Sequence, residues 1–68
     1  MHAYCVNKNA QDTGEHEIHT YNCEHMPDLE NRLHLGTFNT CQEAIKKAKE
    51  YYSNVDGCYY CSKECHTR

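Results

Sequence analysis

Two pairs of residues in this sequence have the types and the spacing that bind a tetrahedral metal ion. Two residues separate Cys58 from Cys61, and three separate His19 from Cys23. A tight turn within such a pair aims both side chains at one point, and structural zinc takes four thiolate or imidazole ligands. Backbone N–H groups in these turns also favour the thiolate form. The pattern predicts one zinc ion bound by His19, Cys23, Cys58 and Cys61.

Other residues leave alternatives to this ligand set open. Cys65 and His66 closely follow the second pair, and either can replace His19 as the fourth ligand. They can also begin a second site with Cys5 and Cys41. We favour His19, because a site made only of C-terminal residues would leave the N-terminal strands unattached in a domain with so thin a core.

The first ligand pair is expected at the end of a β-hairpin. Residues 3–8 and 15–21 are rich in β-branched and aromatic types, and residues 9–14 between them have turn chemistry. Strand alternation points Ile18 to the core and His19 to the opposite face. A short helical turn over residues 26–31 and a third strand over residues 32–36, ended by Gly36, are expected to follow.

A helix is predicted over about residues 40–53. Thr40 and Glu43 form a capping box, in which each side chain satisfies a backbone N–H of the first turn. Apolar residues then recur at helical spacing and define one stripe: Cys41, Ala44, Ile45, Ala48, Tyr51 and Tyr52. Residues 54–57 are expected to end the helix, with Gly57 in the left-handed conformation turning the chain into the second ligand pair.

These elements predict an α+β fold, in which a β-hairpin and a third short strand pack on one α-helix. Residues 1–68 are expected to form a single zinc-binding domain. Hydrophobic residues make up 38% of the chain, with one Phe and no Trp. A core of this kind rarely supplies more than roughly 3–5 kcal/mol of net stability, so a metal ion is expected to add to it.

The motifs resemble those of small bacterial zinc modules. In that pattern, a His-x-x-x-Cys or Cys-x-x-x-Cys motif comes before a short strand. A Ser-x-x-Glu-Ala or Thr-x-x-Glu-Ala motif then opens a helix, and a Cys-x-x-Cys motif follows. Residues 19–61 match this pattern. The group includes the metal-binding domain of the bacterial alkylation-repair activator, which accepts methyl groups from DNA phosphotriesters. The resemblance implies zinc and a small α+β shape. It does not imply methyl transfer, because His19 stands where that domain has its acceptor cysteine.

The end of the chain carries a second resemblance. The run Gly-Cys-x-x-Cys-x-x-x-Cys-His, residues 57–66, is similar to the ends of short bacterial proteins. This similarity implies no particular function.

Composition bounds the compartment and the partners. An export signal has a charged region, then an apolar run and then a small-residue cleavage site, and the opening residues do not show this pattern. We therefore expect a reducing, cytoplasmic location. In such a compartment a high density of cysteine favours metal binding over disulfides. No apolar run predicts membrane insertion. The formal charge of −3 becomes about −4 with zinc and three thiolates, which disfavours nucleic acid.

We interpret the chain as a non-catalytic zinc module that presents a surface to a protein partner. No catalytic triad or phosphate-binding loop is recognisable, and zinc with four protein ligands has no open position for a reactant. One alternative is a thiol or redox protein, which would use Cys58 and Cys61 as a dithiol or Cys41 as a nucleophile. Another is a nucleic-acid-binding zinc module.

Overall fold

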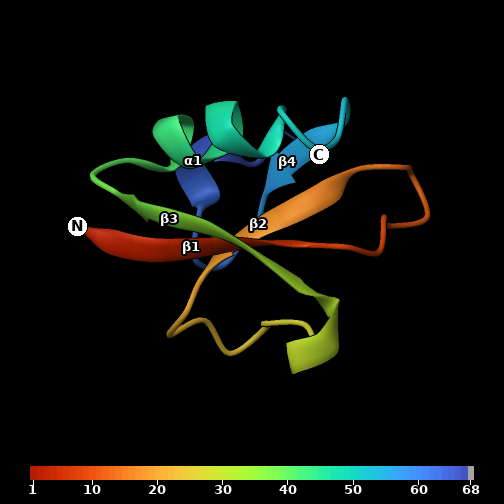
Figure 1. Cartoon of the computed structure of the whole chain (residues 1–68). Coiled ribbons are helices and arrows are strands. Elements are labelled where there is room, and N and C mark those ends of the chain that lie inside the picture. The colour runs from red at the N-terminus through yellow and green to blue at the C-terminus, as the bar shows by residue number, and fades with distance from the viewer. Residues whose placement is uncertain (68) are drawn as a thin grey trace.

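A four-stranded sheet with one α-helix on one face forms the structure, a computed structural model that describes residues 1–67 (Figure 1). The strands are β1 (His2–Asn7), β2 (His16–Thr20), β3 (Arg32–Phe38) and β4 (Val55–Gly57), and the helix is α1 (Cys41–Ala48). Two short 3₁₀ helices, η1 (Leu29–Asn31) and η2 (Lys63–Cys65), complete the chain. The predicted α+β fold, with its hairpin, third strand and single helix, is confirmed.

The sheet has the strand order β3-β1-β2-β4. β1 pairs with β2 and with β3 in antiparallel fashion, as the hairpin prediction requires, whereas β4 runs parallel to β2. The prediction missed β4 and assigned residues 54–57 to a turn. A three-residue strand is too short to show the alternation by which strands are recognised.

β3 is longer than predicted, because Gly36 lies inside the strand. The pairing with β1 passes from His34 opposite Cys5 to Gly36 opposite Tyr4 and so skips one residue. This irregularity is a β-bulge, and Gly36 takes a φ of 128°, which residues with a side chain rarely adopt. The glycine therefore bends the strand and does not end it.

The capping box at the start of α1 is confirmed. The Glu43 N–H donates to Thr40 Oγ1 at 3.3 Å, and the Thr40 N–H donates to Glu43 Oε1 at 3.1 Å. Together these bonds satisfy backbone donors that the first helical turn leaves without partners.

α1 ends at Ala48, five residues earlier than predicted. The backbone then tightens, with the Tyr51 N–H donating to the Ala48 carbonyl at 2.9 Å. Tyr52 stacks on His16 of β2, with ring centroids 3.7 Å apart, and this contact leads the chain toward β4. Tyr51, predicted on the apolar stripe, is 51% exposed as a result.

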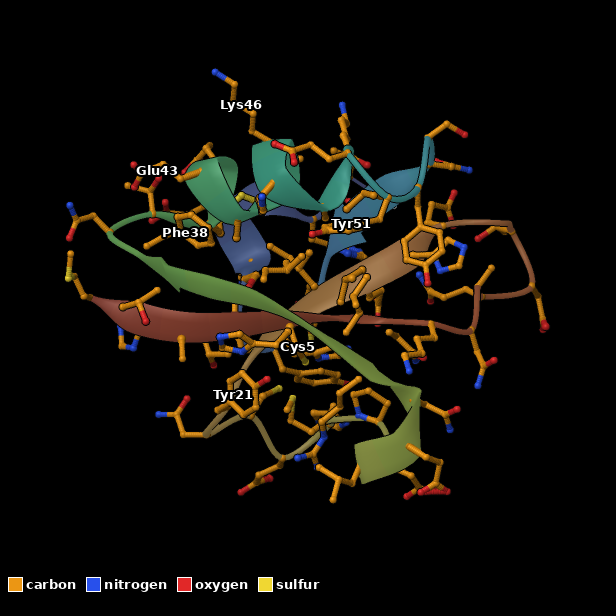
Figure 2. All side chains as sticks on the ribbon, viewed as in Figure 1. Cys5, Tyr21, Phe38, Glu43, Lys46 and Tyr51 are labelled. Carbon is orange, nitrogen blue, oxygen red and sulfur yellow. A yellow bond between two sulfur atoms is a disulfide. The ribbon has the colours of Figure 1, made fainter. Side chains whose placement is uncertain are left out.

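The core lies between α1 and the sheet. Ile18 points into it as predicted, and the next residue, His19, faces the opposite side together with Cys5, its partner on β1. Residues 21–31 run along that side, and Figure 2 shows Cys5 and Tyr21 on the side of the sheet away from α1. The buried residues packed together in the core are Tyr4, Val6, Ile18, Leu35, Cys41, Ala44 and Ala48.

Gly57 has a different role from the one predicted. Positive φ angles within residues 1–67 occur only at Gly14 and Gly36, so Gly57 does not adopt the left-handed conformation. A Cβ atom on Gly57 would lie 2.6 Å from the Ser62 carbonyl oxygen and 2.7 Å from Cys65 Cβ. Glycine is needed here because the chain that follows folds back onto it.

Candidate metal centre

Parallel pairing of β2 with β4 brings the two ligand pairs together. Ile18 lies opposite Gly57 in this pairing, and the Cys58 N–H donates to the Ile18 carbonyl at 3.1 Å. Both strands therefore end at the same edge of the sheet, and His19 and Cys58 become neighbours. The turns that follow β2 and β4 carry the second member of each pair.

The four predicted ligands form one cluster. Their ligand atoms all lie within 4.8 Å of one another, with Cys23 Sγ 3.8 Å from Cys58 Sγ and Cys61 Sγ 3.9 Å from His19 Nδ1. Zinc–sulfur bonds of about 2.3 Å and zinc–nitrogen bonds of about 2.0–2.1 Å place tetrahedral ligand atoms about 3.8 Å apart for two sulfurs and about 3.6 Å apart for sulfur and nitrogen. The donor set and its separations therefore fit a tetrahedral metal ion.

His19 is oriented as a neutral ligand. Burial lowers its pKa to about 4, with a further contribution from the charge of His25. Its Nδ1 faces the sulfurs, and its Nε2 lies 3.8 Å from Glu17 Oε1 on the other side of the ring. A carboxylate beside the second ring nitrogen favours the tautomer that leaves a lone pair on Nδ1.

The three thiols differ in their readiness to ionise. Burial raises the pKa of Cys23 to about 12 and also raises the pKa of Cys58, although the Cys61 and Tyr60 N–H groups oppose it there. Burial acts in the same direction on Cys61, but hydrogen bonds from Cys23 and from the Thr20 N–H, 3.4 Å away, outweigh it and lower its pKa. Cys61 is therefore the first of the three to become a thiolate.

The alternative ligands lie outside the cluster. Cys65 forms a disulfide with Cys41, which the sequence did not reveal, since cysteine spacing carries no pairing information for this contact. His66 Nδ1 donates to the Gly57 carbonyl at 2.9 Å and lies 3.6 Å from Asp56 Oδ2. Both residues hold the C-terminal segment in place.

The structure does not form a second cysteine site from Cys5 and Cys41. Cys5 is fully buried on the side of the sheet away from α1, where its Sγ lies 3.5 Å from Met26 Sδ, and burial raises its pKa to about 11. Cys41 is bonded to Cys65 and has no thiolate to act as a nucleophile while that bond persists.

Two residues that position the site escaped the sequence prediction. Glu17 was treated only as a strand residue. Asp56 was assigned to a turn, yet it is buried and its Oδ1 accepts hydrogen bonds from the Gly57 N–H and from the N–H and hydroxyl of Thr67, at 2.9 to 3.0 Å. Asp56 thereby fastens the end of the chain beside the second ligand pair. No local pattern signals either role, because both depend on neighbours distant in sequence.

No family model, curated protein or solved structure matches this chain. The resemblance to the zinc domain of the alkylation-repair activator therefore rests on the short motifs alone. Within residues 1–67, no helix combines the length and the apolar character needed to cross a membrane.

Proposed function

We propose that this chain is a non-catalytic zinc-binding module whose ion, held by His19, Cys23, Cys58 and Cys61, stabilises a surface for a protein partner. The observation that carries the proposal is the convergence of four soft ligand atoms within 4.8 Å from two separate strand ends. Residues 24–57 separate the two pairs in sequence, so their meeting is a product of the whole fold.

The coordination supports a structural role for the metal. Four protein ligands complete a tetrahedral shell and leave no position for water or substrate. His19 and Cys58 are buried at 2% exposure each, which limits access to two of the four ligands. Structural zinc contributes roughly 10–16 kcal/mol of apparent binding energy, against roughly 3–5 kcal/mol from a core of this size. Zinc is therefore the larger contribution to folding.

Each element of the site has a separate task in this proposal. Bound zinc would supply the charge that keeps three sulfurs ionised in a buried place. The Thr20 N–H donates to Cys61 Sγ and disperses its negative charge. Glu17 orients the His19 ring through Nε2.

The metal site and the Cys41–Cys65 disulfide favour different compartments, because one needs reduced cysteines and the other oxidised ones. We place the protein in the cytoplasm, where thiolate ligands persist and where thiol reductants open disulfides. Cys41 and Cys65 are then mostly thiols, and the metal ion is the cross-link that stabilises the fold. In an oxidising compartment the Cys41–Cys65 bond persists and the domain has both cross-links.

Native mass spectrometry, combined with thiol alkylation, tests the proposal. We expect one zinc ion per chain after expression in zinc-supplemented medium, with Cys23, Cys58 and Cys61 protected from alkylation until a chelator is added. Cys5→Ala is the matched control, because it removes a buried cysteine outside the cluster and should retain one zinc ion. A metal-free protein with further disulfides among the cluster cysteines would overturn the proposal in favour of a thiol or redox protein.

A further inference from the structure

A cavity of about 680 Å³ borders the candidate metal centre. It lies where β1 begins, where β2 and β3 end and where α1 begins. Two of the four ligands, Cys23 and Cys61, belong to its wall and are only half-buried. Its volume is in the range of pockets that take organic ligands or side chains. Part of the metal site thus borders a space that a ligand can enter.

A tyrosine hydroxyl on the wall of the cavity favours a polar occupant. Tyr4 lines the cavity, is 4% exposed and packs its ring against Phe38, with centroids 6.3 Å apart. Its hydroxyl forms no hydrogen bond with any residue in the described range 1–67. The hydroxyl is therefore available to a ligand atom that enters the cavity.

The charges around the cavity select a cation. Zinc with three thiolates carries a net charge of −1, and Glu24 and Glu64 on the wall add two more negative charges. Lys63 also lies on the wall, but its Nζ stands 5.2 Å from the centre of the Tyr59 ring, which is not part of the cavity. Burial, followed by the charges of Cys61, Glu64 and Glu43, raises the pKa of Tyr4 and agrees with a negative potential.

Aromatic rings at the border of the cavity favour a planar cation. Tyr60 and His25 both border the cavity and stack on each other, with ring centroids 3.8 Å apart and planes 17° apart. Tyr60 remains 67% exposed, so part of its ring is free for a further contact. A guanidinium group stacks on aromatic faces and pairs with carboxylates through a planar set of donors, whereas an ammonium group does so less well.

We propose that the cavity binds an arginine side chain of a protein partner, with the guanidinium against Tyr60, between Glu24 and Glu64, and with a donor to the Tyr4 hydroxyl. The inference rests on the proposed function, because the thiolates carry their full negative charge only with metal bound. It deepens that function by naming the partner's chemistry.

The test is a titration of ¹⁵N-labelled, zinc-loaded protein with capped tripeptides, acetyl-Gly-Arg-Gly-amide against the Lys and Glu versions. We expect amide shifts confined to residues around the cavity, with the Arg peptide binding about threefold or more tightly than the Lys peptide and no binding of the Glu peptide. Free arginine serves as a further arm, and equal affinity for it would show that the site takes the amino acid and needs no partner chain. Equal shifts with the Glu peptide, or shifts spread over the whole chain, would overturn the proposal.

Variants test whether binding of the Arg peptide depends on the residues that line the cavity. Glu24→Gln combined with Glu64→Gln should weaken the Arg peptide about tenfold, and Tyr4→Phe about threefold. Glu30→Gln, on η1 and outside the cavity, is the matched control and should leave binding unchanged. Native mass spectra of the same samples report the metal independently. One zinc ion without arginine binding refutes this inference alone, whereas a metal-free protein refutes the proposed function.

Discussion

His19 Nε2 lies 3.8 Å from Glu17 Oε1, while Nδ1 of the same ring lies 3.9 Å from Cys61 Sγ. The two residues are two apart on β2, so their side chains leave the strand on the same face. This arrangement directs one ring nitrogen to the sulfurs and the other to a carboxylate. Carboxylates in this position orient metal-binding histidines and increase their basicity.

Replacing Glu17 should therefore weaken metal binding without removing a ligand. We expect Glu17→Gln to lower zinc affinity about tenfold or more, because the amide is uncharged and polarises the imidazole less. Competition with a chromophoric chelator measures this change. Glu30→Gln, an exposed acid-to-amide change distant from the ring, should leave the affinity unaltered. Equal affinities for the two variants would exclude a role of Glu17 in orienting His19.

Loss of a ligand should unfold the domain. Cys58→Ser removes one of the four zinc ligands, and the remaining core cannot replace about 10–16 kcal/mol of metal binding. We expect collapsed amide dispersion in the NMR spectrum of this variant. Cys5→Ala should keep a dispersed spectrum at a cost of about 1 kcal/mol, since that thiol is buried but lies outside the cluster. A folded wild-type protein in excess chelator would contradict the dominance of the metal.

Opening the disulfide should weaken the domain but leave it folded. Cys41 and Cys65 are 24 residues apart, and closing a loop of that length stabilises a folded chain by about 3.5 kcal/mol in the chain-entropy model. We expect the double variant Cys41→Ala, Cys65→Ala to lose about that much in urea unfolding with zinc present. Wild-type protein with a thiol reductant should approach the double variant. If reduction does not change the unfolding midpoint, the bond does not form in solution.

Acid should release the metal with a steepening dependence on pH. The pKa of His19 is about 4 in the fold, below the ordinary value of about 6.5 expected in the unfolded chain. The stability that the neutral ring contributes is present above pH 6.5 and is lost as the pH falls toward 4.

Zinc release at pH 7.5 should take up about three protons, one for each thiolate, and about four below pH 6, where the released His19 also binds one. The slope of log zinc affinity against pH reports these numbers. His34→Gln, a change on β3 outside the cluster, should leave both slopes as they are. A slope that stays near three at low pH would show that His19 takes up no proton when zinc is released.

Replacing Gly57 should destabilise the fold and also lower the zinc affinity, which a metal titration measures. An alanine Cβ at this position would lie 2.6 Å from the Ser62 carbonyl oxygen, so the segment after Cys58 must shift. We expect Gly57→Ala to cost about 1–3 kcal/mol and to lower zinc affinity as well. Gly14→Ala is the control, because φ of 99° there strains alanine in a turn far from the metal centre. Because zinc binding is coupled to folding, that variant should lower the zinc affinity by no more than its cost in folding, whereas Gly57→Ala should lower it further.

Several features follow from the sequence by itself because they depend on neighbours along the chain. The start of α1 needs only Thr40 and Glu43, three residues apart, and the hairpin needs two strand-forming segments around a short turn. The spacing within each ligand pair is equally local. A tight turn between Cys58 and Cys61 sets their separation whatever the rest of the fold does.

Other features required the tertiary structure because they depend on contacts between distant segments. Parallel pairing of β4 with β2 decides that the two ligand pairs meet, yet β4 is too short to leave a pattern. The Cys41–Cys65 disulfide, the role of Gly57 and the cavity beside Cys61 arise in the same way. Each requires knowledge of which side chains face one another across the fold, and residue spacing along the chain does not contain that information.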